Sequence, residues 1–267
     1  MTVAFDTKLL VPLIFAGFAL LEIVTRRFFQ HEKGTARDVW IEAIGTPVFI
    51  LITVPAIFFT APALMNWVFP GSENAWASLP WWGMLAILLV GDDMTQYWWH
   101  RASHTHPWLY SFHRAHHSGQ YMSIRIAYRN AIAYYIFMPG LWIAAVLVHL
   151  GFGPVYAIYL LVKMTVIFGA HSAVRWDEPL YKIKWLSPVM WVVERTISTP
   201  ATHFAHHGMH KDDGVTHYKG NYGNLLFFWD VLFGTAHITR RYPAEYGIEN
   251  LDDRGAGGEL GWPLIRK

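Results

Sequence analysis

Long apolar stretches recur along the first two thirds of this chain, separated by short polar segments. They lie at about residues 9–25, 46–69, 80–99, 131–150 and 153–171. A helix needs about 20 predominantly apolar residues to cross a bilayer, and these stretches approach or reach that length. The pattern therefore predicts an all-α integral membrane protein with four to five transmembrane helices. Because Pro47, Pro55 and Pro62 interrupt the second stretch, a re-entrant pair over 39–69 is the alternative to one span.

Lysine and arginine are distributed unequally among the segments that join these stretches. The segments after the first and third stretches contain Arg26, Arg27, Lys33, Arg37, Arg101, Arg114, Arg125 and Arg129, whereas residues 70–79 contain neither residue type. Basic residues favour the cytoplasmic side. We therefore expect a multi-pass protein with its N-terminus outside and its C-terminus in the cytoplasm after five crossings. A cytosolic helical cap, 100–130 and 172–240, would complete a single membrane-embedded domain over 1–267.

The amino-acid composition excludes several kinds of cofactor and catalytic group. The chain is 54% hydrophobic over 267 residues and its formal net charge is only +2, which gives no argument for a nucleic-acid partner. It contains no cysteine. Disulfides, haem–thiolate ligation, iron–sulfur clusters and a cysteine nucleophile are therefore excluded within this sequence. Any redox chemistry would take its electrons from a separate protein.

Histidines form three tight clusters beside the apolar stretches. Nine residues are involved: His100 and His104; His113, His116 and His117; His203, His206 and His207; and a single His171. Positions i, i+3 and i+4 of a helix share one face, so we expect each cluster to aim its imidazoles at one point. Grouped imidazoles repel one another once protonated and gain little from packing alone. Convergence of the three clusters would make a cage for a pair of metal ions.

A lone histidine on an apolar helix is more often a packed core residue than a ligand. His31, His106, His149 and His237 have no partner at ligand spacing, and we treat them as non-ligands. The same holds for His210 and His217, which flank a polar stretch and are expected in exposed loops.

Asp93 shares a helical stripe with two of the clustered histidines, His100 and His104. A carboxylate at that position can accept the distal N–H of a ligating imidazole, which would fix its tautomer. The alternative is that Asp92 and Asp93 both lie at the water boundary, and for Asp92 we expect a solvated position.

Asn221-Tyr-Gly-Asn224 is a turn signal in its own right, so a structural role is favoured. The functional alternative is that Asn221 orders a metal-bound water and Asp230 braces a ligand histidine. Further along the cap, Trp185–Trp191 has the pattern of a short amphipathic helix lying in the membrane interface, or of a packed cap helix. The glycine-rich tail after Tyr242 is expected to be loosely ordered.

Taken in order, these motifs resemble the fatty acid hydroxylase / sterol desaturase superfamily. They run from Asp93…Tyr97-Trp-Trp-His100-Arg-Ala-Ser-His104 and His113-Arg-Ala-His116-His117-Ser to Thr199-Pro-Ala-Thr-His203-Phe-Ala-His206-His207-Gly, closing with Asn221-Tyr-Gly and Trp229-Asp…Phe233-Gly-Thr235. The resemblance covers about residues 90–237. The Tyr-Trp-Trp-His-Arg and Thr-Pro…His-His-Gly phrases are most similar to the alkylglycerol monooxygenase-like branch.

The resemblance implies a membrane-embedded, non-haem di-iron enzyme whose ligands are the nine clustered histidines. Its cofactors would be two iron ions, for which zinc could substitute on the same imidazoles. It implies hydroxylation of a membrane lipid or other long apolar substrate with O₂ and an external electron donor of the ferredoxin or cytochrome b5 type. Desaturation or methyl oxidation of a fatty acyl or sterol substrate is the alternative on the same site. A metal transporter and a haem electron carrier are remote alternatives.

Overall fold

The computed structural model describes residues 7–29 and 33–266, which form helices and no β-strand. The predicted all-α class is confirmed. In chain order the elements are α1 (Thr7–Val24), α2 (Ala36–Val48), η1 (Phe49–Thr53), α3 (Val54–Val68), α4 (Trp81–Leu88), η2 (Leu89–Met94), α5 (Thr95–Thr105), α6 (Pro107–His117), η3 (Ile124–Ile126), α7 (Ile132–Ile136), α8 (Pro139–Leu147), η4 (Val148–Phe152), α9 (Gly153–His171), α10 (Glu178–Tyr181), η5 (Lys184–Leu186), α11 (Ser187–Thr196), α12 (Pro200–His206), α13 (Phe228–Leu232) and α14 (Gly255–Gly261).

The second apolar stretch is part of one continuous helical segment, Ala36–Val68, so a re-entrant pair is wrong. It begins ten residues before the predicted span. The π-helical turn η1 lies between Pro47 and Pro55, where the missing proline N–H groups weaken the α-helical ladder. Widening to a π turn lets the helix pass both prolines without ending.

The third apolar stretch continues directly into the first histidine pair. Helix α4, the π-helical turn η2 and helix α5 follow one another without a break from Trp81 to Thr105. Pro107 then begins α6 after the extended His106. His100 and His104 are therefore fixed to the same rod that forms the bundle, which gives them a rigid support.

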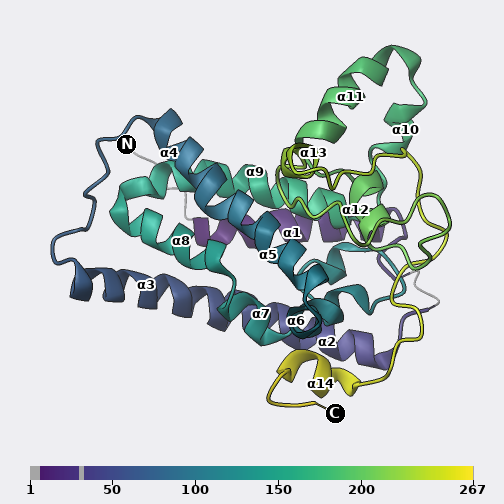
Figure 1. Ribbon diagram of the computed structural model, residues 1–267, viewed down its shortest axis with the longest axis horizontal. Coiled ribbons are helices and arrows are strands. Elements are labelled where there is room, and N and C mark those ends of the chain that lie inside the picture. The colour runs from purple at the N-terminus through teal and green to yellow at the C-terminus, as the bar shows by residue number, and fades with distance from the viewer. Residues whose placement is uncertain (1–6, 30–32, 267) are drawn as a thin grey trace.

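The predicted span 131–150 is not a single helix. It divides into α7 and α8 at Met138, whose backbone is extended (φ −69°, ψ 109°) because Pro139 follows it. At the far end of α8, Gly151 has a φ of +111°, a value that glycine adopts readily. The chain reverses there into α9, so α8 and α9 form a hairpin (Figure 1). The arm from Pro139 to Leu150 is about 18 Å long, less than a hydrocarbon core of about 30 Å.

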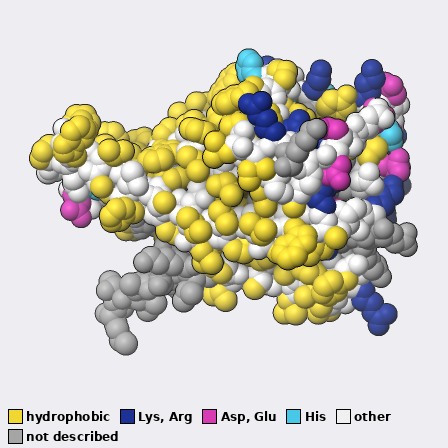
Figure 2. Space-filling model, turned by 90° about the horizontal axis from the view of Figure 1, so that it is seen from below, with side chains coloured by type: hydrophobic (Ala, Val, Ile, Leu, Met, Phe, Trp, Pro, Cys, Tyr) yellow, Lys and Arg dark blue, Asp and Glu magenta, His cyan; other side chains and the backbone are white. Residues whose placement is uncertain are grey.

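Two helical segments, Ala36–Val68 and Pro139–His171, are long and apolar enough to cross a membrane within the described ranges. The second of these contains the reversal at Gly151, and α9 is its longer arm. Apolar side chains on α3 point outward, with Phe59 79% and Trp67 81% exposed. Figure 2 shows hydrophobic side chains over the bundle, with most charged ones gathered at one end. The apolar exterior is typical of a membrane protein; the number of crossings stays a prediction.

The two ends of the bundle differ in content. The loop between α3 and α4 packs on the α8–α9 turn, where Asn74 N donates to His149 O and Trp76 N to Leu150 O. The predicted cap segments gather at the opposite end, around α6 and α12 (Figure 1). Loop 70–79 and the histidine clusters therefore lie at opposite ends of the molecule.

The C-terminal tail is not loosely ordered, contrary to expectation. It forms α14, which packs on α2 and α6 (Figure 1). Buried Glu259 of α14 pairs with the buried guanidinium of Arg114 on α6. The carboxylate of Asp252 also accepts a hydrogen bond from Arg114 at 2.7 Å. These contacts of Arg114 therefore hold the tail in place, although its glycine content had suggested loose order.

The segment Trp185–Trp191 forms η5 and the first half of α11, which projects from the bundle (Figure 1). Trp185, Val189 and Val192 are each more than half exposed, whereas Met190 is buried. A packed cap helix would bury such residues. The exposure favours the interfacial alternative.

Candidate metal centre

All nine clustered histidines converge at the cap end of the bundle, in two adjacent groups. The first group contains His100, His104, His113, His117 and His206. The second contains His116, His171, His203 and His207. Within each group, one nitrogen of every imidazole lies within 4.8 Å of the others, and only His104 is not fully buried. Each group has enough nitrogens for one metal ion.

The expectation that each cluster aims at one point is wrong for the second and third clusters. His113 and His117 join the first group, but His116 of the same helix joins the second. In the third cluster, His203 and His207 belong to the second group, whereas His206 of the same helix belongs to the first. Residues i and i+4 differ by about 40° around a helix, whereas i+3 lies about 60° to the other side of i. Helices α6 and α12 thus each contribute to both groups.

Five of the nine rings donate their Nδ1–H to a fixed oxygen. These pairs are His100 with Tyr222 O (2.8 Å), His113 with Asn130 Oδ1 (2.7 Å), His116 with Ile126 O (3.0 Å), His171 with Ile167 O (2.7 Å) and His206 with Gly220 O (2.7 Å). Backbone carbonyls can only accept, and the Asn130 amide nitrogen donates to Tyr135 Oη, which makes its oxygen the acceptor. Each of these rings therefore carries its proton on Nδ1 and a lone pair on Nε2.

Those lone pairs face one another. The Nε2 atoms of His100 and His113 are 2.9 Å apart, and those of His116 and His171 are 3.4 Å apart, with no proton available to bridge either pair. The buried Nε2 atoms of His104 and His206 have no hydrogen-bond partner. Unpartnered buried acceptors are costly, and lone pairs at this distance repel. A cation within each group would satisfy them.

The spacing of the Nε2 atoms fits that of ligands on a common ion. Further Nε2 pairs are His113–His117 at 3.2 Å, His171–His203 at 2.9 Å and His203–His207 at 3.1 Å. Metal–imidazole bonds of about 2.0–2.1 Å place two ligand nitrogens about 2.9 Å apart at a right angle and about 3.4 Å apart at the tetrahedral angle. All five distances fall in this range.

Burial keeps the rings in the ligand-competent state. It lowers the pKa of His100 to about 4. It also holds the pKa values of His104, His113, His116, His117, His203, His206 and His207 well below their usual range. Because a histidine must be neutral to bind a metal ion, both groups are ready to do so at neutral pH.

Asp93 does not touch an imidazole, so its expected contact is wrong. Its carboxylate accepts hydrogen bonds from Leu225 N (3.2 Å), Leu226 N (3.1 Å) and Trp229 Nε1 (2.8 Å). The Nδ1–H of His100 is instead taken by the carbonyl of Tyr222. Asp93 therefore contacts the segment that follows this carbonyl and not the histidine itself.

Asp230 holds the same loop from its other side, and it too contacts no ligand histidine directly. Its carboxylate accepts from Tyr222 N (2.8 Å), Gly223 N (2.6 Å) and Thr235 Oγ1 (2.6 Å). A Cβ on Gly223 would lie 2.9 Å from the Asp230 oxygen, so a side chain there would disturb this contact. Asp230 thus fixes the peptide next to the carbonyl that orients His100.

Asn221 braces the loop rather than a water molecule. Its amide nitrogen donates to Thr202 O and His237 O, both at 2.9 Å, and its oxygen accepts from His237 N at 2.7 Å. Both amide hydrogens are used, and Asn221 adopts a φ of +55°, which asparagine tolerates in turns. These contacts agree with the structural role that the turn signal favoured.

Asp92 is buried, so the expectation of a solvated residue is wrong. Its carboxylate accepts from Lys163 Nζ (2.6 Å), Tyr159 Oη (2.9 Å) and Gln96 Nε2 (2.8 Å). Lys163 lies within the apolar helix α9, and each charge neutralises the other inside the bundle. A lysine and an aspartate in neighbouring apolar stretches were a signal for this pair.

None of the histidines expected to be non-ligands belongs to either group among the described residues. His149 lies at the opposite end and contacts Ser72 Oγ at 3.0 Å. His210 is partly exposed and bonds Glu245 and Glu249. His217 is less exposed than expected, with its ring 5.0 Å from that of His237. His31 lies outside the described residues.

Comparisons with known proteins agree with the geometry. The sequence model described as fatty acid hydroxylase matches residues 85–235. Alkylglycerol monooxygenase of Homo sapiens is 27% identical over 225 residues, which are 83% of this chain and 46% of that protein. Fatty acid hydroxylase vlmA of Lecanicillium sp. is 30% identical over 174 residues, 61% of this chain and 45% of that protein.

A third relative extends the range of reaction types. Very-long-chain aldehyde decarbonylase GL1-5 of Oryza sativa subsp. indica is 24% identical over 198 residues, 70% of this chain and 29% of that protein. The chain therefore spans at most about half the length of these curated relatives. No solved structure matches.

Proposed function

Because the chain belongs to the fatty acid hydroxylase family, we propose that it oxidises a long apolar substrate with dioxygen, using two metal ions held by its nine clustered histidines. The observation that carries this proposal is the division of the histidines into two adjacent groups whose Nε2 lone pairs converge. Hydroxylation of an aliphatic carbon is the reaction proposed. Desaturation or methyl oxidation on the same site is the alternative, and the decarbonylase relative supports keeping it.

Iron is the metal proposed for both groups, with zinc as a surrogate that the same imidazoles would accept. Two iron ions would supply the one-electron and O₂ chemistry that attack on an unactivated C–H bond requires. The chain itself would keep the imidazoles neutral, oriented and buried away from water. The five Nδ1–H bonds to fixed oxygens perform the orientation.

We propose that an apolar substrate reaches the centre along the bundle without crossing water. The bundle exposes apolar side chains such as Phe59 and Trp67 of α3, and α11 exposes Val189 and Val192. A lipid or other long apolar molecule is therefore the proposed substrate class.

A pocket with polar residues in its lining lies next to His104. A pocket of about 320 Å³ is lined there by Arg101, His104, Lys219 and Tyr222, among others. His104 is the only ligand candidate that is not fully buried. Because the sequence contains no cysteine for a redox relay, we propose that an external donor of the ferredoxin or cytochrome b5 type supplies the electrons.

The arrangement disfavours the remote alternatives. A metal transporter would have ligands on several spans near the bilayer midplane, whereas α6 and α12, which carry five of these histidines, lie at one end of the bundle (Figure 1). A haem carrier needs two axial ligands on opposite faces of each iron, whereas here four or five imidazoles converge. An optical spectrum without a Soret band would agree with the proposal.

Comparative lipid mass spectrometry tests the function. Cells that express the wild-type chain should contain an oxidised lipid that is absent from cells expressing His116→Ala at the same level. Identical lipid profiles in the two cultures would contradict the proposed activity.

The topology can be tested independently. With basic residues at the histidine end and none in 70–79, we propose that five crossings in total leave the metal centre and the C-terminus in the cytoplasm and this loop outside. Reporter fusions after Asn74 and after Lys267 are then expected to score on opposite sides of the membrane. Scoring on the same side would show that the number of crossings between them is even.

Asp93→Asn is expected to leave the chain folded but to weaken metal retention or activity by about 10–100-fold, as loss of an outer partner usually does. An amide cannot accept all three hydrogen bonds from Leu225, Leu226 and Trp229, so the loop that orients His100 would shift. Metal content after graded chelator treatment measures the effect. Wild-type behaviour of Asp93→Asn beside an inactive Asp230→Asn would assign the support of this loop to Asp230 alone.

A further inference from the structure

We propose that Glu22, a buried carboxylate of α1 outside the matched family region, is a positioning residue for the second histidine group, with Arg129 and Asp38 supporting the same segment. The inference rests on the proposed metal centre. On this proposal, residues of the N-terminal helices α1 and α2 hold in place the chain segments that carry the second histidine group.

Glu22 is the only charged residue between Leu9 and Thr25, and it is fully buried. A carboxylate in an apolar helix is costly unless it is paired or hydrogen-bonded. Glu22 has no cationic partner among its described contacts and accepts three hydrogen bonds instead. The donors are Ser123 Oγ (2.6 Å), Ile124 N (2.9 Å) and Ala173 N (2.8 Å).

These donors join the two chain segments that carry the second group. Ala173 is two residues beyond His171, so Glu22 fixes the chain where α9 ends. Ser123 and Ile124 begin the turn η3, which ends at Ile126, and the carbonyl of Ile126 accepts the Nδ1–H of His116. One carboxylate thus ties together the supports of His116 and His171, whose Nε2 atoms face each other.

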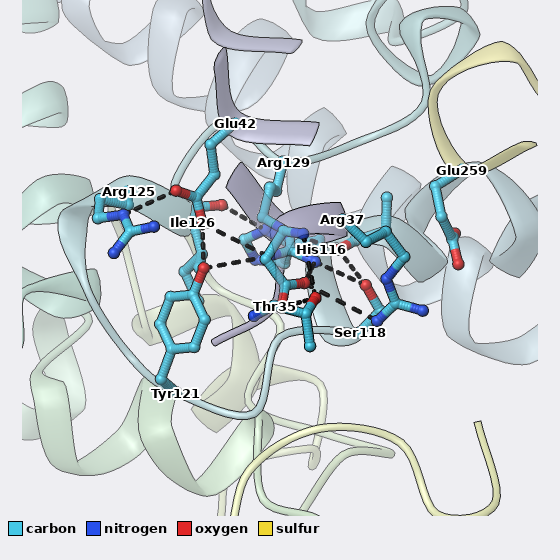
Figure 3. Close-up of polar contacts among 12 residues, drawn as sticks. Thr35, Arg37, Glu42, His116, Ser118, Tyr121, Arg125, Ile126, Arg129 and Glu259 are labelled. Carbon is cyan, nitrogen blue, oxygen red and sulfur yellow. Dashed lines mark hydrogen bonds and ion pairs between the residues drawn. The ribbon is translucent and has the colours of Figure 1, made fainter. Parts of the chain in front are cut away.

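Arg129 fixes the other end of this turn (Figure 3). Its backbone N–H donates to the same Ile126 carbonyl at 3.0 Å. Its fully buried guanidinium donates to Ala115 O (3.0 Å), Ser118 Oγ (2.8 Å) and Asp38 of α2 (2.7 Å). The guanidinium therefore locks the turn to the end of α6, on which His116 lies.

The first group has different supports. His100 and His206 donate to carbonyls of the loop 220–222, and His113 donates to Asn130. None of these oxygens is bonded to Glu22, whose contacts stop at the 123–124 and 173 segments. Loss of the Glu22 carboxylate should consequently release the ion of the second group first.

The test measures metal content of the purified full chain by mass spectrometry, after graded exposure to a chelator. In Glu22→Gln the amide oxygen can still accept from Ile124 N and Ala173 N, which share Oε1, but the negative charge is lost and the amide N–H₂ replaces the acceptor of Ser123 Oγ. We expect about two ions per chain to become about one, with the affinity for the released ion reduced about 10–100-fold. Glu194→Gln is the matched control, because Glu194 is equally buried but bonds Arg240 and Arg195 on the α11 side. It should retain both ions.

Double variants separate a local effect from general loosening. Combined with His116→Ala, Glu22→Gln should cause no further metal loss, since both act on the same group. Combined with His206→Ala, it should leave the chain with almost no metal. Equal loss from both groups in Glu22→Gln, or unchanged content, would overturn the inference. Wild-type protein that binds no pair of ions would overturn the proposed metal centre as well.

Ser123→Ala gives a milder version of the experiment if Glu22→Gln fails to fold. It removes one of the three donors to Glu22 and leaves both backbone contacts in place. The ion of the second group should then be lost at lower chelator concentrations than in the wild type, ahead of the other ion. Arg129→Lys, which cannot reach Ala115, Ser118 and Asp38 together, should act in the same direction. Wild-type chelator resistance in both variants would contradict the role of this segment.

Discussion

Replacing His116 with alanine is expected to remove one of the two metal ions and to abolish activity, and replacing His206 should remove the other. Each of the two residues is the middle histidine of a His-x-x-His-His motif, in α6 and α12 respectively, but they belong to different groups. Removal of His116 leaves three nitrogens in the second group, and removal of His206 leaves four in the first. The loss in His116→Ala should therefore be the more complete.

The magnitude follows from the role of a direct ligand. Loss of an outer hydrogen-bond partner typically lowers metal affinity or activity about 10–100-fold, so loss of a ligand should exceed about 100-fold. Neighbouring histidines cannot replace the missing nitrogen, because the adjacent His117 and His207 already serve groups of their own. Metal analysis of the purified variants, together with their lipid-oxidising activity, measures the effect.

His149→Ala provides the matched control. His149 is also buried, but it lies at the opposite end of the molecule and bonds Ser72. This variant should keep both ions. Unchanged occupancy in both His116→Ala and His206→Ala would end the hypothesis of a histidine cage, whereas metal loss in His149→Ala would point to general destabilisation.

The nine histidines could be predicted from the sequence because helical spacing alone groups them. Their division into two sets could not. Which group a ring joins depends on how α6 and α12 face each other, and His116 and His206 join the groups opposite to those of their helix neighbours because the two helices pack around both groups. Local periodicity places residues on a face of a helix but does not say what lies opposite that face.

The outer supports were harder to predict for a related reason. The stripe that joins Asp93 to His100 is real, but the nearest acceptor for the His100 proton is a carbonyl 122 residues away in the sequence. Backbone acceptors leave no trace in residue type. Buried charges do leave one, and Glu22 in the first apolar stretch and Lys163 in the last were visible signals of buried contacts.

The membrane architecture was predictable in outline. Each apolar stretch contains helix, and the reversal at Gly151 falls between the predicted stretches 131–150 and 153–171. The break at Met138, inside the first of these two stretches, was missed because the preference of the residue before Pro139 is conformational rather than hydrophobic. Hydrophobicity cannot show that Met138 is extended before a proline, or that the chain reverses through a left-handed glycine. These two residues divide an apolar region of more than 30 residues into three helices.

Turnover is expected to place an oxygen atom from dioxygen into an aliphatic position of a lipidic product. Helices α6 and α12, which carry five of the nine histidines, lie at one end of the bundle (Figure 1). We therefore expect a long chain to approach from the bilayer and electrons to arrive from the proposed cytoplasmic side. The experiment supplies isotopically labelled dioxygen, an external reductant and membranes that contain the wild-type chain. Products are then compared by mass spectrometry with those of His116→Ala membranes.

The origin of the oxygen atom discriminates between the proposed reactions. The proposed hydroxylation predicts that the label comes from dioxygen and not from labelled water, because the oxidant would derive from O₂ at a site that buries eight of its nine histidines. A desaturated product without label would agree with the proposed metal centre but would show that the reaction is desaturation and not hydroxylation. If the wild type and His116→Ala give the same lipids, and label enters no product, the chain is not an oxygenase, because every step assigned to the histidine groups predicts a difference between these two proteins.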